Sequence, residues 1–412
     1  MSLNDTPRGE RVCIGFFGKR NAGKSSLVNS FTGQKLSIVS DVKGTTTDPV
    51  YKAMELLPLG PVEIVDTPGF DDEGELGELR IKKCFEVMRK IDAAIIVIDI
   101  SENYDSRVDS ILAGLKERSI PTIIALNKAD MSEASGSDVE KKLEELKAAG
   151  INNSLLTMRV SALKGVGIEE LKSKTAEILN RGEIKDRELL PDCVKPNDLV
   201  VLVVPIDSAA PKGRLILPQQ QVIRALLERG ALSVVTTVET LALTLDSLKT
   251  RPKLVVTDSQ AFGEVSKIIP EDILLTGFSV LFAKYKGDLE WQTEGASTLD
   301  EIKTGDKILI AEGCTHHRQC GDIGTVKLPN WIRKYTNSEP EFTFVSGGEF
   351  SSKEDLASYK LVIHCGGCML NPNEMKYRVN ASKNEGVPIT NYGIAIAKMH
   401  GILDRSLEVF NK

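Results

Sequence analysis

The sequence lacks any apolar run long enough to cross a bilayer. Its longest apolar runs, such as Ile95–Ile100 and Leu199–Val204, have the length of buried strands, whereas a spanning helix needs roughly 18 residues. No secretion signal is expected either, because the first apolar run, Val12–Phe17, is short and leads into a glycine-rich loop. We therefore expect a cytoplasmic protein with no membrane partner.

An excess of positive charge is absent too. The 52 Lys and Arg residues stand against 58 Asp and Glu residues, which gives a net charge of −6. This balance argues against a broad nucleic-acid surface, so no nucleic-acid partner is expected. The 412 residues exceed what one hydrophobic core usually spans and predict two or three domains.

A disulfide framework is not indicated, because the chain has an odd number of cysteines, seven, and the expected compartment is reducing. Three of them, Cys13, Cys84 and Cys193, are scattered and are interpreted as small buried hydrophobes. The other four crowd into one C-terminal stretch together with three of the four histidines.

The first part of the chain alternates short apolar runs with amphipathic segments, which is typical of a mostly parallel sheet covered by helices. The expected strands are Val12–Phe17, Val62–Val65, Ala93–Ile98, Pro121–Leu126 and Leu155–Val160. The expected helices are Gly77–Lys90, Val139–Ala149 and Ile168–Leu179. A charged segment with two prolines follows, and the first domain is therefore assigned to residues 1–181.

Two further α/β regions are expected. Residues 182–262 hold a small βαβαβ unit with little core of its own, with strands at Leu199–Val204, Leu232–Val235 and Leu254–Thr257 and helices at Pro218–Glu228 and Glu239–Leu248. Residues 263–412 form the third region, with strands expected at Val280–Tyr285, Lys307–Ala311, Phe342–Val345 and Lys360–Ile363. Its helices are expected at Thr298–Ile302, Ile323–Tyr335, Asn373–Glu385 and Tyr392–Met399.

The run from Gly18 to Ser25 fits a P-loop and stands between a strand and a helix. Glycines such as Gly23 let backbone N–H groups close around phosphates, and the helix N-terminus adds a positive dipole end. Lys24 is expected to reach the β- and γ-phosphates, and the Ser25 hydroxyl to bind Mg²⁺. A P-loop alone specifies ATP as readily as GTP.

Three later motifs, each after an expected strand, select GTP. Asp66-Thr67-Pro68-Gly69 offers a carboxylate for the Mg²⁺ shell and the Gly69 N–H for the γ-phosphate. Asn127-Lys128-Ala129-Asp130 ends in a carboxylate that accepts two hydrogen bonds from guanine, which adenine cannot offer. Ser161-Ala162 supplies a backbone N–H for the guanine O6.

These motifs resemble the TrmE–Era–EngA branch of the translation-factor-related GTPases. The resemblance implies that Thr46, within Gly44-Thr45-Thr46-Thr47-Asp48, is the second Mg²⁺ ligand and γ-phosphate sensor. Phe70 follows Gly69 where Ras-like proteins carry the glutamine that orients water, so slow hydrolysis is expected. Asn21, followed by Ala22-Gly23-Lys24-Ser25-Ser26, fits the potassium-activated members and implies K⁺ stimulation.

The C-terminal cysteines and histidines predict a soft-metal site. Cys314-Thr315-His316 and His364-Cys365-Gly366-Gly367-Cys368 each follow an expected strand, so they can meet at one sheet edge. Thiolates select zinc or iron–sulfur centres. The residue chemistry leaves zinc and a [4Fe–4S] cluster about equally favoured.

The combination of a GTPase, a small βαβαβ unit and a C-x-H…H-C-x-x-C module closely resembles the [FeFe]-hydrogenase maturation GTPases, the HydF family. The run Pro205 to Leu215 also resembles that family's middle domain. The resemblance implies a P-loop GTPase domain followed by a dimerisation domain and a metallocluster-binding domain. It implies that Cys314, Cys365 and Cys368 ligate a [4Fe–4S] cluster, with His316 or His364 near the fourth position. The roles of His317 and Cys320 stay open.

The same resemblance implies a homodimeric scaffold. It would receive a di-iron precursor from radical-SAM maturases and deliver it to the apo-[FeFe]-hydrogenase. Two other hypotheses remain: an RNA-modification or ribosome-assembly GTPase with a structural zinc module, and a redox protein regulated by GTP.

Overall fold

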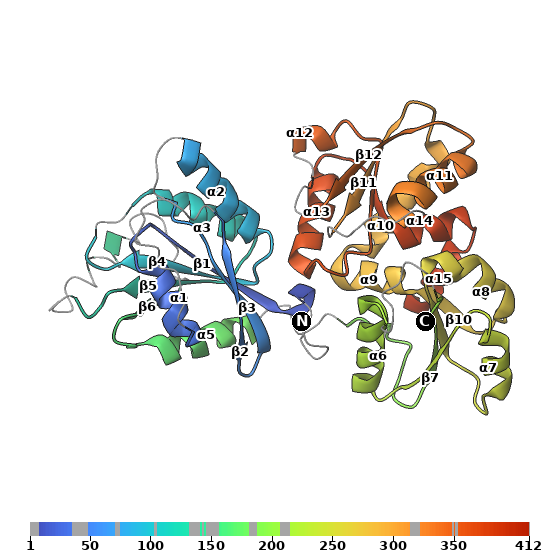
Figure 1. The fold of residues 1–412 in the computed structure, drawn as a ribbon, viewed down its shortest axis with the longest axis horizontal. Helices are drawn as coiled ribbons and strands as arrows, with labels where there is room; N and C mark the ends of the chain where they lie inside the picture. Colours follow the sequence, from blue (N-terminus) through green and yellow to red (C-terminus); the bar gives the residue numbers. More distant parts are fainter. Residues whose placement is uncertain are drawn as a thin grey trace. The chain divides into compact units, whose positions relative to one another are not determined.

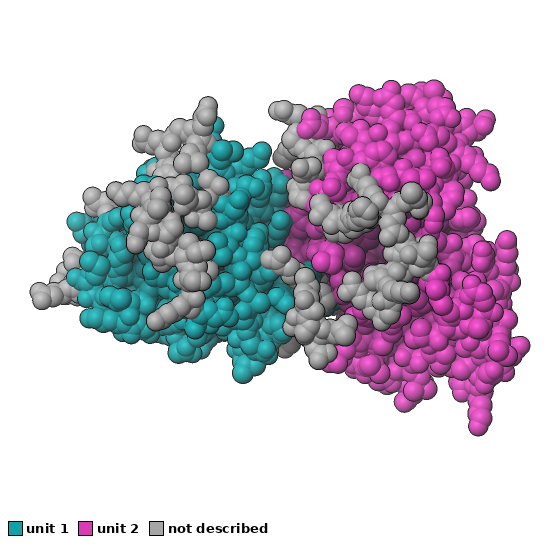
Figure 2. Space-filling model, viewed as in Figure 1, with its two compact units in different colours: residues 1–186 teal, residues 187–412 magenta. Residues whose placement is uncertain are grey.

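The computed structural model describes residues 8–34, 48–70, 75–102, 105–131, 141, 144–145, 156–180, 188–206, 215–313, 322–347, 350 and 353–411. The chain divides into two compact units, Met1–Asp186 and Arg187–Lys412, which Figure 2 colours separately. Three sheets with flanking helices make up the described residues (Figure 1), and the expected α/β fold class is confirmed.

Unit 1 contains one six-stranded sheet with the strand order β2-β3-β1-β4-β5-β6. Its strands are β1 (Val12–Gly18), β2 (Val50–Leu56), β3 (Gly60–Asp66), β4 (Ala93–Asp99), β5 (Thr122–Asn127) and β6 (Leu156–Arg159). Its helices are α1 (Lys24–Thr32), α2 (Glu75–Met88), α3 (Arg107–Glu117) and α5 (Ile168–Asn180). Helices α1 and α5 cover one face of the sheet, and α2 and α3 cover the other (Figure 1).

The central strands β1, β4 and β5 are apolar along most of their length, with polar residues at the ends of β4 and β5, because both faces of the sheet are covered. In β1, Ile14 and Phe16 belong to the core under α1 and α5, whereas Cys13 and Phe17 belong to the core under α2 and α3. The five expected strands of this unit are confirmed. The half-exposed strand β2 pairs antiparallel with β3 and is not among the expected strands, because its sequence lacks a continuous apolar run. The expected helix Val139–Ala149 lies largely outside the described residues.

Unit 2 contains two four-stranded parallel sheets, ordered β10-β9-β7-β8 and β12-β11-β13-β14. The strands of the first are β7 (Leu199–Val203), β8 (Leu232–Thr236), β9 (Leu254–Thr257) and β10 (Leu274–Gly277). Those of the second are β11 (Lys307–Glu312), β12 (Glu341–Ser346), β13 (Leu361–His364) and β14 (Ile389–Asn391). The helices are α6 (Leu217–Arg229), α7 (Leu241–Ser247), α8 (Phe262–Ile268), α9 (Phe278–Lys286), α10 (Leu289–Ser297), α11 (Leu328–Thr336), α12 (Lys353–Leu356), α13 (Pro372–Asn384), α14 (Tyr392–Met399) and α15 (Leu403–Leu407).

The middle βαβαβ unit is larger than its sequence pattern indicates. The strand β10 pairs with β9 and completes the first sheet of unit 2. The four residues of β10 follow residue 262, at which the expected second domain ended. This short strand gives no clear periodic signal, because four buried residues fit a strand or a helix equally well.

The expected strand Val280–Tyr285 is wrong, because these residues form the helix α9. Helix α9 contacts α6 and β10 on one side and α10, α13 and α14 on the other, and in Figure 1 it lies between the two sheets of unit 2. Most of its side chains are buried. A helix that is buried over most of its circumference can have the same nearly continuous apolar sequence as a buried strand.

The three scattered cysteines Cys13, Cys84 and Cys193 are buried, as expected for small hydrophobes. In the part of the chain that the structure describes, no helix has both the length and the apolar character needed to cross a membrane.

Candidate functional sites

The P-loop of unit 1 connects the last residue of β1, Gly18, to the first residue of α1, Lys24. Gly23 precedes the helix with φ of 80°, a left-handed conformation that favours glycine. A Cβ atom at Gly23 would lie 2.3 Å from Asn127 Nδ2. The loop therefore requires glycine here both for its backbone conformation and for the close approach of Asn127.

Lys24 and Asp66 form the charged centre of this site. The Lys24 ammonium lies 3.4 Å from Asp66 Oδ1, and both side chains are buried. Asp66 Oδ1 accepts no hydrogen bond within the described residues. The next residue, Thr67, fixes this end of β3 because its hydroxyl donates to the Phe16 carbonyl at 2.7 Å. A buried carboxylate oxygen beside a lysine fits a site for Mg²⁺ and phosphate.

Asn127 joins the phosphate loop to the guanine loop. Its Nδ2 donates to the Ala22 carbonyl at 2.9 Å, and its Oδ1 accepts from the Ala162 N–H at 3.1 Å. The side chain is 1% exposed. Two loops that are far apart in the sequence are thus held by the two ends of one amide group.

Asp130 and Ser161 lie together at the same sheet edge. The Ser161 hydroxyl donates to Asp130 Oδ1 at 2.5 Å. This hydrogen bond holds the pKa of the Asp130 carboxyl below its usual value. The Asp130 carboxyl is therefore held in its ionised form, in which both of its oxygens accept hydrogen bonds.

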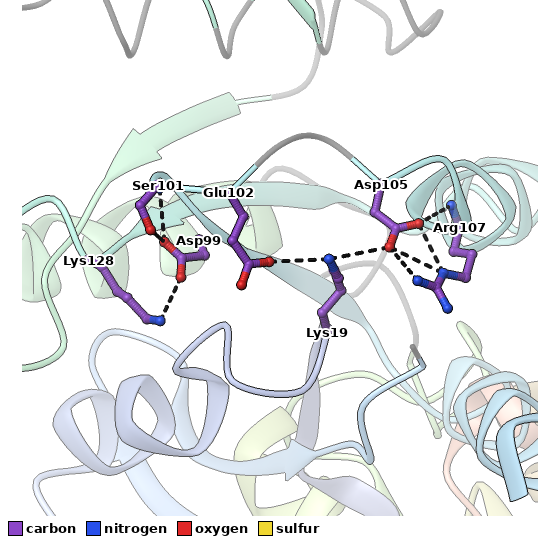
Figure 3. A network of polar contacts seen from close by, with 7 residues as sticks. All are labelled: Lys19, Asp99, Ser101, Glu102, Asp105, Arg107 and Lys128. Atoms are coloured by element: carbon purple, nitrogen blue, oxygen red, sulfur yellow. Dashed lines mark hydrogen bonds and ion pairs between the residues drawn. The ribbon is translucent and has the colours of Figure 1, made fainter. Parts of the chain in front are cut away.

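A network of charged side chains borders the P-loop (Figure 3). Lys19 pairs with Glu102 at 3.2 Å and with Asp105 at 3.4 Å, and Asp105 also pairs with Arg107. Separately, Lys128 donates to Asp99 at 2.6 Å. The hydrogen bond from Arg107 lowers the pKa of Asp105 to about 2.

The sequence motifs did not include these acidic partners. Their only sequence signal is the concentration of Asp99, Glu102 and Asp105 just after the apolar run of β4. In the structure, Glu102 and Asp105 pair with Lys19 of the P-loop. Asp99, from the same segment of the chain, pairs with Lys128.

The second candidate site lies where β11 and β13 end. The two strands are parallel neighbours, with Ala311 opposite His364. The Cys365 N–H donates to the Ala311 carbonyl at 2.9 Å, and the Gly313 N–H donates to Cys365 Sγ at 3.0 Å. Cys365 therefore lies against the residue that directly precedes Cys314 in the sequence.

His364 is fully buried, and both of its ring nitrogens are engaged. Its Nδ1 lies 2.7 Å from the Cys365 carbonyl, and Arg378 donates to its Nε2 at 3.0 Å. Arg378 also donates to Glu374 at 2.9 Å. Burial, followed by the charge of Arg378, lowers the pKa of His364 to about 3, so the ring is neutral. In this conformation His364 presents no nitrogen to a metal.

Several expected site residues lie outside the described residues, namely Thr46, Cys314, His316, His317 and Cys320. Within the described ranges, no group of three or more His, Cys, Asp and Glu side chains is placed to hold a metal ion. The convergence of Cys314 with Cys365 and Cys368 stays a prediction. Burial raises the pKa of the Cys368 thiol, and the charge of Lys286 opposes this effect.

Comparison with known families accounts for all three parts of the chain. Residues 13–128 match the family described as "50S ribosome-binding GTPase". Residues 189–287 match the "Hydrogen maturase F dimerization domain", and residues 290–409 match the "Hydrogen maturase F tetramerization domain". The chain belongs to the hydrogen maturase F family. Its architecture is thus a P-loop GTPase domain followed by the dimerisation and tetramerisation domains of that family.

Curated relatives also place this hydrogen maturase F chain in the TrmE–Era–EngA-like superfamily. It is 35% identical over 174 residues to the tRNA modification GTPase MnmE of Clostridioides difficile. The aligned region covers 42% of this chain and 36% of the relative. It is 34% identical over 171 residues to the GTPase Der of Wolinella succinogenes, covering 40% of this chain and 36% of the relative. The chain thus spans a little over a third of the length of these relatives.

Among solved structures, Era from Aquifex aeolicus bound to GDP and aluminium fluoride is 21% identical. The matched region covers 55% of this chain and 92% of the Era chain, with a TM-score of 0.37. A similarity at this level supports no functional argument.

Proposed function

We propose that this chain binds GTP with Mg²⁺ and hydrolyses it to GDP and phosphate. The buried pair of Lys24 and Asp66, with one carboxylate oxygen that accepts no hydrogen bond among the described residues, is the observation that carries this proposal. Mg²⁺, when bound, would neutralise charge on the phosphates. Ser25, Asp66 and Thr46 are the residues proposed to hold it.

The chain's own residues then have separate tasks in GTP binding. The backbone from Gly18 to Gly23 surrounds the α- and β-phosphates, and Lys24 contacts the β- and γ-phosphates. The Gly69 N–H contacts the γ-phosphate. Asp130 accepts hydrogen bonds from guanine, while Lys128, held by Asp99, and the Ser161-Ala162 backbone complete the base site.

Hydrolysis is proposed to be slow and stimulated by K⁺. Phe70 is buried where Ras-like GTPases carry a glutamine, so no side chain at this position orients the attacking water. Asn21 is exposed on the P-loop with φ of 63°, and its side-chain oxygen is the proposed K⁺ contact. Turnover measured in KCl and in NaCl at equal ionic strength tests this role, and equal rates in both salts would exclude it.

We further propose that Cys314, Cys365 and Cys368 bind a [4Fe–4S] cluster. The hydrogen bond from the Gly313 N–H to Cys365 Sγ supports this assignment, because backbone donors to cysteine sulfur are typical of cluster sites. The same hydrogen bond holds Gly313, the residue directly before Cys314, against Cys365. His364 was a candidate for the fourth position, but its bonds to Arg378 and to the Cys365 carbonyl favour His316 instead.

The cluster-bearing unit is proposed to act as a scaffold and carrier. It would receive a di-iron precursor from radical-SAM maturases and transfer it to the apo-[FeFe]-hydrogenase. An exchangeable fourth position on the cluster suits such a transfer. Family membership supports this role.

Self-association is part of the proposal. The strand β8 lies at the edge of its sheet, and Leu232 and Val235 on it are 57% and 46% exposed. Leu227 and Leu243 on the neighbouring helices are exposed as well. An apolar edge strand with unpaired backbone groups is a surface for pairing with another chain. We therefore propose a homodimer through β8.

We also propose that the boundary between the middle and third domains lies near residue 288 instead of residue 262.

Anaerobic reconstitution with iron and sulfide tests the cluster. The wild-type chain is expected to bind about four irons, and Cys365→Ala or Cys368→Ala to abolish this binding without weakening GTP binding. Cys193→Ala is the matched control, because Cys193 is a buried cysteine of the same unit outside the motif. Stoichiometric zinc with no iron uptake would reject the cluster and favour a structural zinc module.

A further inference from the structure

The chain that leaves β4 lies between the two loops of the nucleotide site. In the sheet of unit 1, β4 is the neighbour of both β1 and β5, and the three strands are parallel. Strand β1 leads into the P-loop, and β5 leads into the guanine motif that ends at Asp130. Because the carboxyl ends of parallel strands meet at one edge of a sheet, residues just after β4 can reach both loops.

Asp99, the last residue of β4, holds the guanine motif. Its Oδ2 accepts from the Lys128 ammonium at 2.6 Å. Its Oδ1 accepts from the Ser101 hydroxyl at 2.6 Å and from the Ser101 N–H at 2.9 Å. Asp99 is 4% exposed, so its carboxylate is both buried and fixed at each oxygen. Lys128 has φ of 63°, a conformation that costs energy in a residue with a Cβ and that a fixed partner helps to retain.

Glu102 and Asp105 hold the P-loop through Lys19 (Figure 3). The Lys19 ammonium lies 3.2 Å from Glu102 Oε2 and 3.4 Å from Asp105 Oδ2. Arg107 in turn donates to Asp105 Oδ1 at 3.0 Å and to Asp105 Oδ2 at 2.8 Å. The Asp105 carboxylate is therefore oriented by the start of α3 independently of its contact with Lys19.

The backbone that carries these carboxylates is supported from the core. Ile100, directly after Asp99, and Val108, in the first turn of α3, are both buried in the core under α2 and α3. Moving either end of the segment would expose apolar surface to water, which is unfavourable. The carboxylates thus act from a rigid base, whereas the P-loop and the guanine motif are the parts that they hold.

We propose that Asp99, Glu102 and Asp105, here called the acidic brace, position the P-loop and the guanine motif together and thereby slow the release of guanine nucleotide. This inference deepens the proposed GTP site and rests on it. A nucleotide leaves only when its phosphates and its base both come free, so fixing both loops to one segment lowers the rate of release. The brace acts through Lys19 and Lys128, and its members are positioning residues with no part in the hydrolysis step.

Release of a fluorescent GDP analogue from the full chain, chased with excess GDP at fixed Mg²⁺ and KCl, tests the proposal. Asp99→Asn is expected to speed release roughly tenfold or more, because a buried charge-assisted hydrogen bond is lost. Lys19→Met is expected to speed it about threefold, because its pair is partly exposed. Lys19→Arg keeps the charge and should stay within about twofold of the wild type. Lys174→Met is the matched control, since Lys174 pairs with Glu177 at 2.8 Å on α5, away from the brace, and it should leave release unchanged.

Two further measurements separate positioning by charge from a general loss of structure. Raising the ionic strength from about 0.1 M to about 0.5 M with choline chloride, at constant KCl, should speed release from the wild type more than from Lys19→Met, because salt screens the pair of Lys19. The kcat at saturating GTP should stay within about twofold of the wild type in Lys19→Met while KM rises, because only binding depends on the brace.

The outcomes distinguish the brace from its alternatives. Release rates of Asp99→Asn and Lys19→Met within about twofold of the wild type would overturn the proposal. Equal acceleration in Lys19→Arg and Lys19→Met, or the same salt response in Lys19→Met and the wild type, would overturn the role of charge. If circular dichroism shows that Asp99→Asn does not fold, the Lys19 variants and the salt response still decide. A wild-type chain that binds no guanine nucleotide would instead refute the proposed function.

Discussion

Replacement of Asn127 by alanine should loosen the nucleotide site without touching a phosphate or magnesium contact. The amide of Asn127 is the link between the Ala22 carbonyl of the P-loop and the Ala162 N–H of the guanine loop. Alanine removes both hydrogen bonds at once. No water reaches this position easily, because Asn127 is 1% exposed and Ala22 is 2% exposed.

The magnitude follows from the two backbone groups that lose their partner. A buried polar group left unsatisfied costs roughly 1 to 3 kcal/mol. The Ala22 carbonyl should show the full cost, and the Ala162 N–H, which lies in a half-buried residue, a smaller one. We expect the unfolding free energy of unit 1 to fall by roughly 2 to 4 kcal/mol. GTP affinity should fall by roughly tenfold or more, because the two loops no longer hold each other in place.

Urea denaturation and binding of a fluorescent GTP analogue measure the two effects in the full chain. Both tryptophans, Trp291 and Trp331, lie in unit 2, so their fluorescence provides an internal control that should not change. Circular dichroism follows both units together. Asn180→Ala, at an exposed asparagine in the last position of α5, is the matched control and should change stability by less than about 0.5 kcal/mol. A similarly small change in Asn127→Ala, with GTP affinity within about twofold of the wild type, would refute this account of the site.

Three other perturbations test separate parts of the molecule. Asp130→Asn should shift preference from GTP toward xanthosine triphosphate in a competition assay, because an amide pairs with the xanthine oxygen, and an unchanged GTP preference would contradict the role of this carboxylate. Asp105 has its pKa lowered to about 2 by Arg107, so its contribution to stability is present above about pH 4 and is lost as the pH falls toward 2. Asp105→Asn should therefore flatten the acid dependence of unfolding in that range, and an unaltered slope would exclude the effect. Val235→Lys should place a charge on the edge strand β8 and shift the chain toward monomer in sedimentation, whereas an unchanged assembly state would place the interface elsewhere.

Much of unit 1 could be predicted from the sequence because its signals are local. A glycine-rich turn between an apolar strand and a helix specifies a P-loop, and Asp66 and Asn127 each end an apolar run. The edge strand β2 had no such signal, since only one of its faces is buried. The acidic partners of Lys19 were not predicted because a surface ion pair requires knowledge of which loops meet.

Unit 2 was harder because its informative contacts cross long sequence distances. The buried run of α9 fits a strand or a helix, and the choice depends on the two layers that pack around it. His364 was predicted as a candidate ligand from its place beside Cys365. The position of Arg378, fourteen residues later on α13, decides that both ring nitrogens are engaged.

The sequence by itself determined the class of fold and the residue types available to each part of the chain: a glycine-rich loop with a lysine, a carboxylate at the end of a strand segment, and a C-x-x-C pair of thiols. Such information resides in residue types at short spacing, where backbone geometry leaves few alternatives. The tertiary structure alone decided which partner each polar group takes, including Asn127 between two loops, Arg378 on His364, and Lys128 on Asp99. These pairings depend on how helices and sheets pack, and a buried charge or amide takes whichever partner that packing brings within reach.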